Sequence, residues 1–299
     1  MSTAYALAPR LRGREDSAVV AGDRPTEIRL NGGFVNDIHL VGDTVRRTAG
    51  PWTSAVHSLL RYLEQAGLEG VPRVHGIDQQ RREVLSHLPG RTPEWDRWPD
   101  VLVHGNGVEQ LGAFLRRYHD AVAGFRPPPG AVWRNPLAPK TGEVVRHGDF
   151  SPFNSVWRHD GQLVGVIDWD FAQPGDALTD LAYLARYVVP LAPARQLASY
   201  GLPSWLPRAR RLERLCAAYR EVAPRDVLME LIVLIKQEIG DTAILGDRGL
   251  HPWKNFVADG NISIWRAELS WLQERGHTLL ADGHTLRPAC PVEDGQRHP

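Results

Sequence analysis

The sequence predicts an α+β fold of two lobes, a small β-rich N-terminal lobe followed by a larger, mainly helical one. Short, roughly alternating apolar runs separated by turn residues fill the segment from Ile28 to His87. Beyond the breaker Leu88-Pro89-Gly90, apolar residues recur at helical spacing. The chain has 299 residues, of which 42% are hydrophobic, enough for both lobes and a substantial core.

These patterns divide the chain into four segments. We expect a loose lead-in at 1–24, a β-rich N-terminal lobe at 25–88, a mainly helical C-terminal lobe at 89–282, and a frayed tail at 283–299.

The N-terminal lobe is expected to hold strands and one helix. Apolar side chains at Val56, Leu59, Leu60 and Leu63 predict an amphipathic helix over 52–65. The expected strands are 34–41 and 44–48, joined by a turn at Gly42-Asp43, and then 73–77 and 83–88.

The C-terminal lobe is expected to be helical, with short strands around its polar motifs. Strands are predicted at 144–145, 155–157 and 163–167. Helical periodicity predicts helices at 108–123, 177–189, 208–222, 226–243 and 261–275.

Composition excludes several classes of protein. The formal net charge is +0, which gives no general attraction to nucleic acid or to an anionic membrane. The two cysteines, Cys216 and Cys290, form no Cys-x-x-Cys pair, which argues against a zinc ribbon or a disulfide scaffold. The most apolar stretch, 227–235, is too short to span a bilayer and contains Glu230. We therefore expect a soluble, cytoplasmic protein without nucleic-acid or membrane partners.

The strongest signal for chemistry is the segment R-H-G-D-F-S-P-F-N at 146–154. His147, Asp149 and Asn154 have the H-x-D-x-x-x-x-N spacing that kinases use. A further carboxylate, Asp168, ends the next short apolar strand, where kinases place a Mg²⁺ ligand. Asp149 alone could be a turn-capping residue. The three residues together predict phosphoryl transfer, with Asp149 as the base and with Asn154 and Asp168 on Mg²⁺.

Three nearby residues admit two interpretations. His147 could bind metal, but no second histidine stands at ligand spacing, so a packed loop histidine that bonds backbone near Asp168 is favoured. Asp170 could join the metal site or cap the next loop. Asp180 could cap a helix or tether the catalytic loop.

These motifs resemble the aminoglycoside phosphotransferase family, whose members have a protein-kinase-like fold. The resemblance rests on H-G-D-F-S-P-F-N, V-I-D-W-D and G-D-A-L-T-D-L-A between Arg146 and Tyr183, and on L-G-A-F-L-R-R-Y-H at 111–119. It implies that ATP or GTP binds between the lobes, that Asp149 is catalytic, and that Asn154 and Asp168 hold Mg²⁺.

The N-terminal lobe matches that family less closely. Gly32 and Gly33 stand where a loop would cover the nucleotide phosphates, although a hairpin turn is an equal alternative. Arg46 is the expected phosphate contact on the third strand. His57 stands where the family has the glutamate that pairs with this basic residue. His87 and Leu88 are placed, by position only, in the hinge that would bond the base.

The leading hypothesis is a kinase for a hydroxyl of a small acceptor, with an antibiotic such as an aminoglycoside among the candidates. Trp253 and Trp265 could line the acceptor site, although a packing role in the core is favoured for the tryptophans. A non-catalytic, kinase-like immunity protein that sequesters a toxin or antibiotic is the alternative, motivated by the Arg46 and His57 departure. A metal-dependent hydrolase is disfavoured, because it would need more ligands at close spacing.

Overall fold

The structure is a computed structural model that describes residues 27–30, 38–94, 97–193, 196–197, 201–203 and 205–281. The expected lead-in and tail, the segment that contains Gly32 and Gly33, and the first half of the predicted 34–41 strand lie outside these residues.

A five-stranded antiparallel sheet forms the first part of the chain, in the order β1-β2-β3-β5-β4. Gly42 takes a positive φ of 62° in the predicted turn between β2 and β3, a conformation that glycine adopts without steric cost. In the centre of the sheet, Arg46 faces Val84 and Arg47 faces Glu83. The strands are β1 (Glu27–Arg29), β2 (Ile38–Val41), β3 (Thr44–Thr48), β4 (Val74–Ile77) and β5 (Arg82–Ser86).

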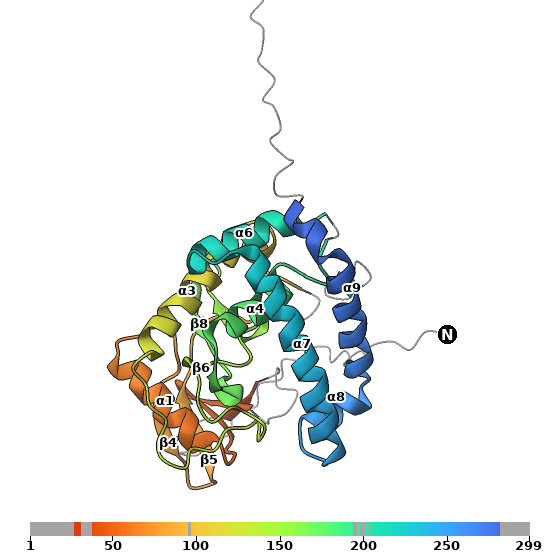
Figure 1. Cartoon of the computed structure of the whole chain (residues 1–299). Coiled ribbons are helices and arrows are strands. Elements are labelled where there is room, and N and C mark those ends of the chain that lie inside the picture. Colours follow the sequence, from red (N-terminus) through yellow and green to blue (C-terminus); the bar gives the residue numbers. More distant parts are fainter. Residues whose placement is uncertain are drawn as a thin grey trace, which may run out of the picture.

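Helix α1 (Thr53–Gln65) lies beside β4 and β5 in Figure 1 and carries the predicted apolar face. Its residues Val56, Leu59 and Leu63 have no measurable exposure. The helix therefore secures the sheet to the rest of the molecule by burying apolar surface.

The second part of the chain is mainly helical. Helix α4 lies at its centre, with α7 beside it, and α8 and α9 flank α7 on the other side (Figure 1). The helices are α2 (Asp100–Val103), α3 (Gly107–Val122), α4 (Ala177–Val188), α6 (Arg208–Tyr219), α7 (Pro224–Asp247), α8 (Trp253–Ala258) and α9 (Asn261–Ala281). The five predicted helices are confirmed within a few residues; the short α2 and α8 were not predicted.

Two small antiparallel sheets carry the polar motifs. One pairs β6 (Val144–Arg146) with β9 (Gln173–Gly175), and the other pairs β7 (Ser155–Trp157) with β8 (Leu163–Val166). Strand β9 was not predicted, because its Gln-Pro-Gly sequence lacks the apolar alternation of a strand. The 3₁₀ turns η1 (Pro152–Asn154) and η2 (Trp169–Phe171) follow the loops that hold Asp149 and Asp168.

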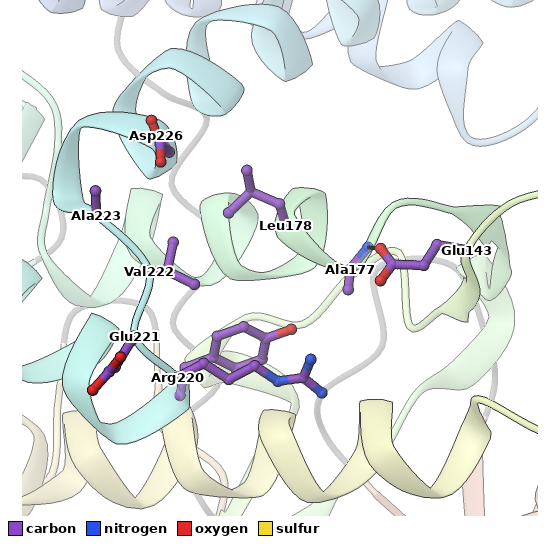
Figure 2. A pocket seen from close by; sticks show the side chains of 9 residues that line it. Glu143, Ala177, Leu178, Arg220, Glu221, Val222, Ala223 and Asp226 are labelled. Atoms are coloured by element: carbon purple, nitrogen blue, oxygen red, sulfur yellow. Dashed lines mark hydrogen bonds between the residues drawn. The ribbon is translucent and has the colours of Figure 1, made fainter.

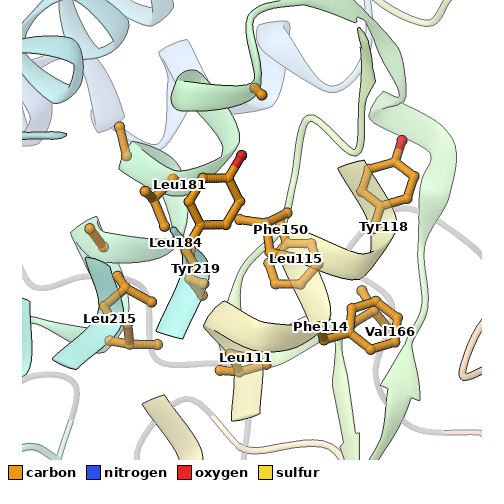
Figure 3. Close-up of a cluster of buried hydrophobic side chains, with 14 of the residues drawn as sticks. Leu111, Phe114, Leu115, Tyr118, Phe150, Val166, Leu181, Leu184, Leu215 and Tyr219 are labelled. Atoms are coloured by element: carbon orange, nitrogen blue, oxygen red, sulfur yellow. The ribbon is translucent and has the colours of Figure 1, made fainter. Parts of the chain in front are cut away.

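A continuous hydrophobic core supports these loops. Phe150, next to Asp149, is fully buried and packs against Phe114 of α3 with ring centroids 6.0 Å apart (Figure 3). The connection after α1 joins the same core, because Val166 donates its backbone N–H to the Gly70 carbonyl at 2.8 Å. A Cβ at Gly165 would lie 2.0 Å from that carbonyl, so only glycine permits this approach.

The predicted α+β fold, with a β-rich first part and a helical second part, is confirmed. The proposed segment boundaries stay predictions. Within the part of the chain that the structure describes, no helix combines the length and the apolar character needed to cross a membrane.

Candidate active site

The catalytic-loop candidate, residues 147–154, leaves β6 and passes directly against η2. Gly148 has φ +78°, and a Cβ there would lie 2.1 Å from the Phe171 carbonyl oxygen. A glycine is therefore required for this loop to approach the segment that holds Asp168.

Asp180, at the start of α4, tethers the loop. Its carboxylate accepts the backbone N–H groups of His147 at 2.7 Å and Gly148 at 3.0 Å. His119 of α3 contacts the same carboxylate at 3.2 Å. Burial alone would raise the pKa of Asp180, but the hydrogen bond and charge of His119 and the charges of Arg146 and His147 lower it below its ordinary value. The tethering interpretation is thus confirmed.

His147 is a packed loop histidine. Its Nε2 lies 3.2 Å from the Ile167 carbonyl oxygen, and its Nδ1 lies 3.3 Å from the Asp149 backbone nitrogen, which donates to it. Burial lowers the pKa of the ring, which keeps it neutral with the proton on Nε2. The structural interpretation of His147 is confirmed. Over the described residues, no group of three or more histidine, cysteine, aspartate or glutamate side chains is placed to hold a metal ion.

Asp149 and Asn154 are joined directly. Asn154 Nδ2 donates to both the Asp149 carbonyl and its Oδ2, each at 2.9 Å. Tyr183 of α4 donates its hydroxyl to the other carboxylate oxygen, Oδ1, at 2.7 Å. Burial and the nearby charge of Asp168 raise the pKa of Asp149 to about 7, against the opposing effect of these two donors.

Asp168 lies next to this pair. Ile167 donates its backbone N–H to the Asn154 carbonyl at 2.8 Å, which brings Asp168 beside Asn154. Asp168 has a left-handed backbone with φ 62° and ψ 66°, unusual for a residue other than glycine and frequent at functional sites. Its side chain is 43% exposed. The structure therefore brings the three predicted residues together.

The oxygens of this group fit a hard cation. The amide nitrogen of Asn154 makes both of its hydrogen bonds to Asp149. The amide oxygen of Asn154 lies on the other side of the amide group from this nitrogen. Mg²⁺ prefers such oxygen ligands and commonly uses one or two carboxylates together with phosphate. Asn154 and Asp168 are the residues that would hold it.

The basic residue at this site is Arg47, one position after the predicted Arg46. Its guanidinium donates to Asp168 Oδ1 at 3.0 Å and to Asp170 Oδ1 at 2.7 Å. Because side chains alternate along a strand, Arg46 lies on the opposite face of β3. Arg47 is buried, yet the charges of Asp170, Glu83 and Asp168 outweigh its desolvation and raise its pKa.

The carboxylate that pairs with this arginine comes from β5. Glu83 forms an ion pair with Arg47 through Nε, and its other oxygen lies 2.9 Å from His57 Nε2. All three side chains are buried. His57 thus lies on α1, where the resemblance placed the glutamate partner of the basic residue. The negative charge beside Arg47 comes instead from Glu83 of β5.

Asp170 is held by two arginines. It is buried between Arg47 and Arg134, which donates to its Oδ2 at 2.8 Å. Arg134 in turn lies 4.6 Å from the ring centroid of Trp52 and 4.7 Å from that of Phe171. These cation–π contacts join the start of α1 to η2.

The predicted hinge and acceptor residues have contacts of their own. His87 uses its backbone N–H to bond the Asp43 carbonyl at 2.9 Å, so this donor is already engaged. The hinge role of His87 and Leu88 stays a prediction. Trp253 packs edge-on against Phe171 at 6.1 Å, and Trp265 lies beside Arg186 with 5.8 Å between guanidinium and ring centroid.

Sequence reasoning missed Tyr183, Glu83 and Arg134. Tyr183 had a usable signal, because it stands one helical turn after Asp180 and so faces the same loop. The other two come from distant segments, and nothing local marked them.

A pocket elsewhere in the molecule is separate from these residues. It has a volume of about 310 Å³ and lies between the start of α4 and the connection from α6 to α7 (Figure 2). Glu143, Tyr219 and Asp226 are among its lining residues, and Asp149, Asn154 and Asp168 are not.

Comparisons with known proteins identify the family and the fold of this chain. Residues 130–212 match the model of the phosphotransferase enzyme family. The trifolitoxin immunity protein of Rhizobium leguminosarum bv. trifolii is 36% identical over 198 residues, which cover 64% of this chain and 74% of that protein.

Two solved structures share the fold. The GDP complex of aminoglycoside 2′-phosphotransferase-IIIa has a TM-score of 0.53 at 15% identity, over 87% of this chain and 93% of that one. The Plasmodium vivax ethanolamine kinase has a TM-score of 0.52 at 11% identity, over 82% and 85%. The chain belongs to the phosphotransferase enzyme family and has a protein-kinase-like fold.

Proposed function

We propose that this protein, a phosphotransferase by its family, transfers the γ-phosphate of ATP or GTP to a hydroxyl of a small acceptor in the cytoplasm. Asp149 is the base, and Asn154 and Asp168 are the Mg²⁺ ligands. The single observation that carries the proposal is the convergence of these three side chains. Asn154 bonds Asp149 at 2.9 Å and, through its carbonyl, the residue before Asp168 at 2.8 Å.

The protein residues have separable tasks. Asp149 orients the attacking hydroxyl and accepts its proton, and a pKa near 7 suits a base that works at neutral pH. Asn154 fixes the Asp149 carboxylate through Nδ2, and its amide oxygen would bind the cation. When bound, Mg²⁺ neutralises negative charge on the transferring phosphate.

Arg47 is the proposed contact for the donor phosphates, in place of Arg46. Its guanidinium already lies within hydrogen-bond distance of Asp168, beside the cation site. A guanidinium binds phosphate in two-point geometry and keeps its charge when buried.

Relatives of known class support the choice of substrate. One solved neighbour is an aminoglycoside phosphotransferase in complex with GDP, and another is an ethanolamine kinase. Both names describe transfer to a small hydroxylated amine. We therefore include aminoglycosides among the acceptors, and GTP beside ATP as donor.

The test is transfer from γ-labelled ATP and GTP, each with Mg²⁺, to a panel of aminoglycosides and small amino alcohols. Labelled product is expected with the wild-type protein and not with Asp149→Asn. The variant should still bind Mg·nucleotide, measured by calorimetry. Equal product formation by both proteins would refute the role of Asp149.

A second candidate function is sequestration of a toxin without turnover. The 36% identity to a trifolitoxin immunity protein favours it. So does the Arg47 bond to Asp168, because an arginine that stays there would occupy one of the two oxygens of a metal ligand.

Growth assays separate the two functions. Cells that carry wild-type protein or Asp149→Asn are challenged with aminoglycosides and with trifolitoxin. Protection that needs Asp149 supports phosphoryl transfer, whereas equal protection by both proteins supports sequestration.

A further inference from the structure

The Asp149 carboxylate is held from both sides by donors on different elements. Asn154 in η1 donates to Oδ2 at 2.9 Å, and Tyr183 in α4 donates to Oδ1 at 2.7 Å. Two bonds to two oxygens fix the plane of the carboxylate, because rotation about its bond to Cβ would break both. The Asn154 bond belongs to the motif already described; the Tyr183 bond does not.

The ring of Tyr183 is itself fixed by its neighbours. It packs against Tyr187, one turn later on α4, with centroids 5.4 Å apart at 57°. Tyr187 packs edge-on against Phe153 at 5.9 Å, and Phe153 directly precedes Asn154. Contacts between aromatic rings therefore connect Tyr183 to Asn154. Because these rings are rigid, their packing fixes the spacing between the two donors.

The Tyr183 hydroxyl uses one of the two acceptor positions of Asp149 Oδ1. A carboxylate oxygen has two lone pairs and accepts two hydrogen bonds. With Tyr183 on one lone pair of Oδ1 and Asn154 on Oδ2, the second lone pair of Oδ1 has a fixed direction. A hydroxyl that approaches along it is oriented before the transfer begins, which is how positioning lowers a barrier.

We propose that Tyr183 is a positioning residue for phosphoryl transfer, whose hydroxyl holds the Asp149 carboxylate in the orientation that receives the acceptor hydroxyl. The inference rests on the proposed function, since it gives Asp149 the role of base. Tyr183 does not itself take the proton; it acts through Asp149.

The test compares Tyr183→Phe with Tyr62→Phe. The first change keeps the ring and removes only the donor to Asp149. Tyr62 of α1, outside the site, is a matched control. Like Tyr183 it is half-buried and packs on another aromatic ring, that of Phe125, with ring centroids 5.2 Å apart. The probe reaction is hydrolysis of Mg·ATP, with water as the acceptor, followed as kcat and KM.

Tyr183→Phe is expected to lower kcat roughly ten- to a hundredfold, the effect of one hydrogen bond to a charged group, without a change in KM for Mg·ATP or in Tm. Tyr62→Phe should leave all three unchanged. A kcat for Tyr183→Phe that equals or exceeds the wild-type value would overturn the inference. So would a fall in kcat matched by a fall in Tm, because that would indicate a purely structural role.

A crystal structure of Tyr183→Phe supplies a readout that does not need turnover. The Asp149 carboxylate should rotate away from the wild-type orientation, and an unmoved carboxylate would overturn the inference. If the wild-type protein hydrolyses no nucleotide and transfers no phosphate, the proposed function fails. The orientation of Asp149 in the variant then decides separately whether Tyr183 positions it.

Discussion

The catalytic-loop candidate, residues 147–154, and the sheet meet at Asp168, but their polar groups are arranged in different ways. On the loop side, Asp149 and Asn154 stand five residues apart and bond each other directly. On the sheet side, Arg47 draws partners from β5 and η2, up to 123 residues away. The first arrangement follows from one short segment, and the second exists only when the whole chain has folded.

The difference separates two kinds of contribution. The loop group is partly exposed, whereas the buried group of Arg47, Glu83 and Asp170 links the sheet to the helical part. Changes on the loop side should therefore affect rate, and changes on the sheet side should affect stability first.

The largest effect on rate is expected from Asp149. Asp149→Asn removes the proton acceptor while it keeps a similar shape, so kcat should fall at least about a thousandfold, within the range for loss of a general base. The free energy of unfolding should change by less than about 1 kcal/mol. Steady-state kinetics measure kcat, and urea denaturation measures the free energy of unfolding. A loss of stability well above about 1 kcal/mol would contradict the distinction between the two regions.

The largest effect on stability is expected from Arg47. Arg47→Ala leaves Glu83 and Asp170 buried with fewer charge partners, and should lower the free energy of unfolding by about 3–5 kcal/mol. Arg46→Ala, on the other face of the same strand, should cost below about 1 kcal/mol. Chemical denaturation of the two variants tests whether Arg47 carries this stability. Similar losses in Arg47→Ala and Arg46→Ala would contradict it.

Asp180 should show an intermediate effect with a defined pH dependence. Its pKa is lowered in the folded protein, so the stability it contributes is present above its unfolded pKa, near 3.9, and is lost as pH falls through the folded pKa. Asp180→Asn should cost about 2–3 kcal/mol at pH 7, because one of its two loop N–H bonds must be given up.

The control for Asp180 is Asp176→Asn, at the exposed N-cap of the same helix, where the side chain makes no capping bond. The free energy of unfolding, measured by urea titration from pH 7 to pH 3, should fall less steeply for Asp180→Asn than for wild type. Parallel curves for the two proteins would show that Asp180 does not contribute the predicted pH-dependent part of the free energy of unfolding.

The smallest effect is expected from His57. His57→Gln can still donate to Glu83, whereas His57→Leu cannot, and the second variant should be less stable by about 1–2 kcal/mol. Thermal unfolding of the two variants measures the difference. Equal stabilities would mean that Arg47 alone satisfies Glu83.

The sequence was informative where chemistry is local. The spacing of Asp149 and Asn154, the strand before Asp168 and the helical period after Ala177 each predicted a feature that the structure contains. The structure brings Arg47 to Asp168, one residue after the predicted Arg46. Thr-Val-Arg-Arg-Thr carries a basic side chain on each face of the strand, and alternation alone cannot choose between them.

What could not be predicted depends on distant contacts. Glu83 was assigned only to a strand, since nothing near it in sequence marks a partner for Arg47. Strand β9 was missed because its Gln-Pro-Gly sequence has no apolar alternation, and it forms only against β6.

The most direct test of the central claim is the Mg²⁺ dependence of nucleotide binding, measured by calorimetry with ATP in the presence of Mg²⁺ or EDTA. In the wild-type protein, Mg²⁺ should tighten ATP binding at least about tenfold, because in the proposed site Asp168 and Asn154 would hold the cation together with the phosphates. Asp168→Asn should abolish most of that gain, and Asp160→Asn, an exposed carboxylate on the β7–β8 turn, should retain it. A gain from Mg²⁺ that is the same in all three proteins would contradict the assignment of Asp168.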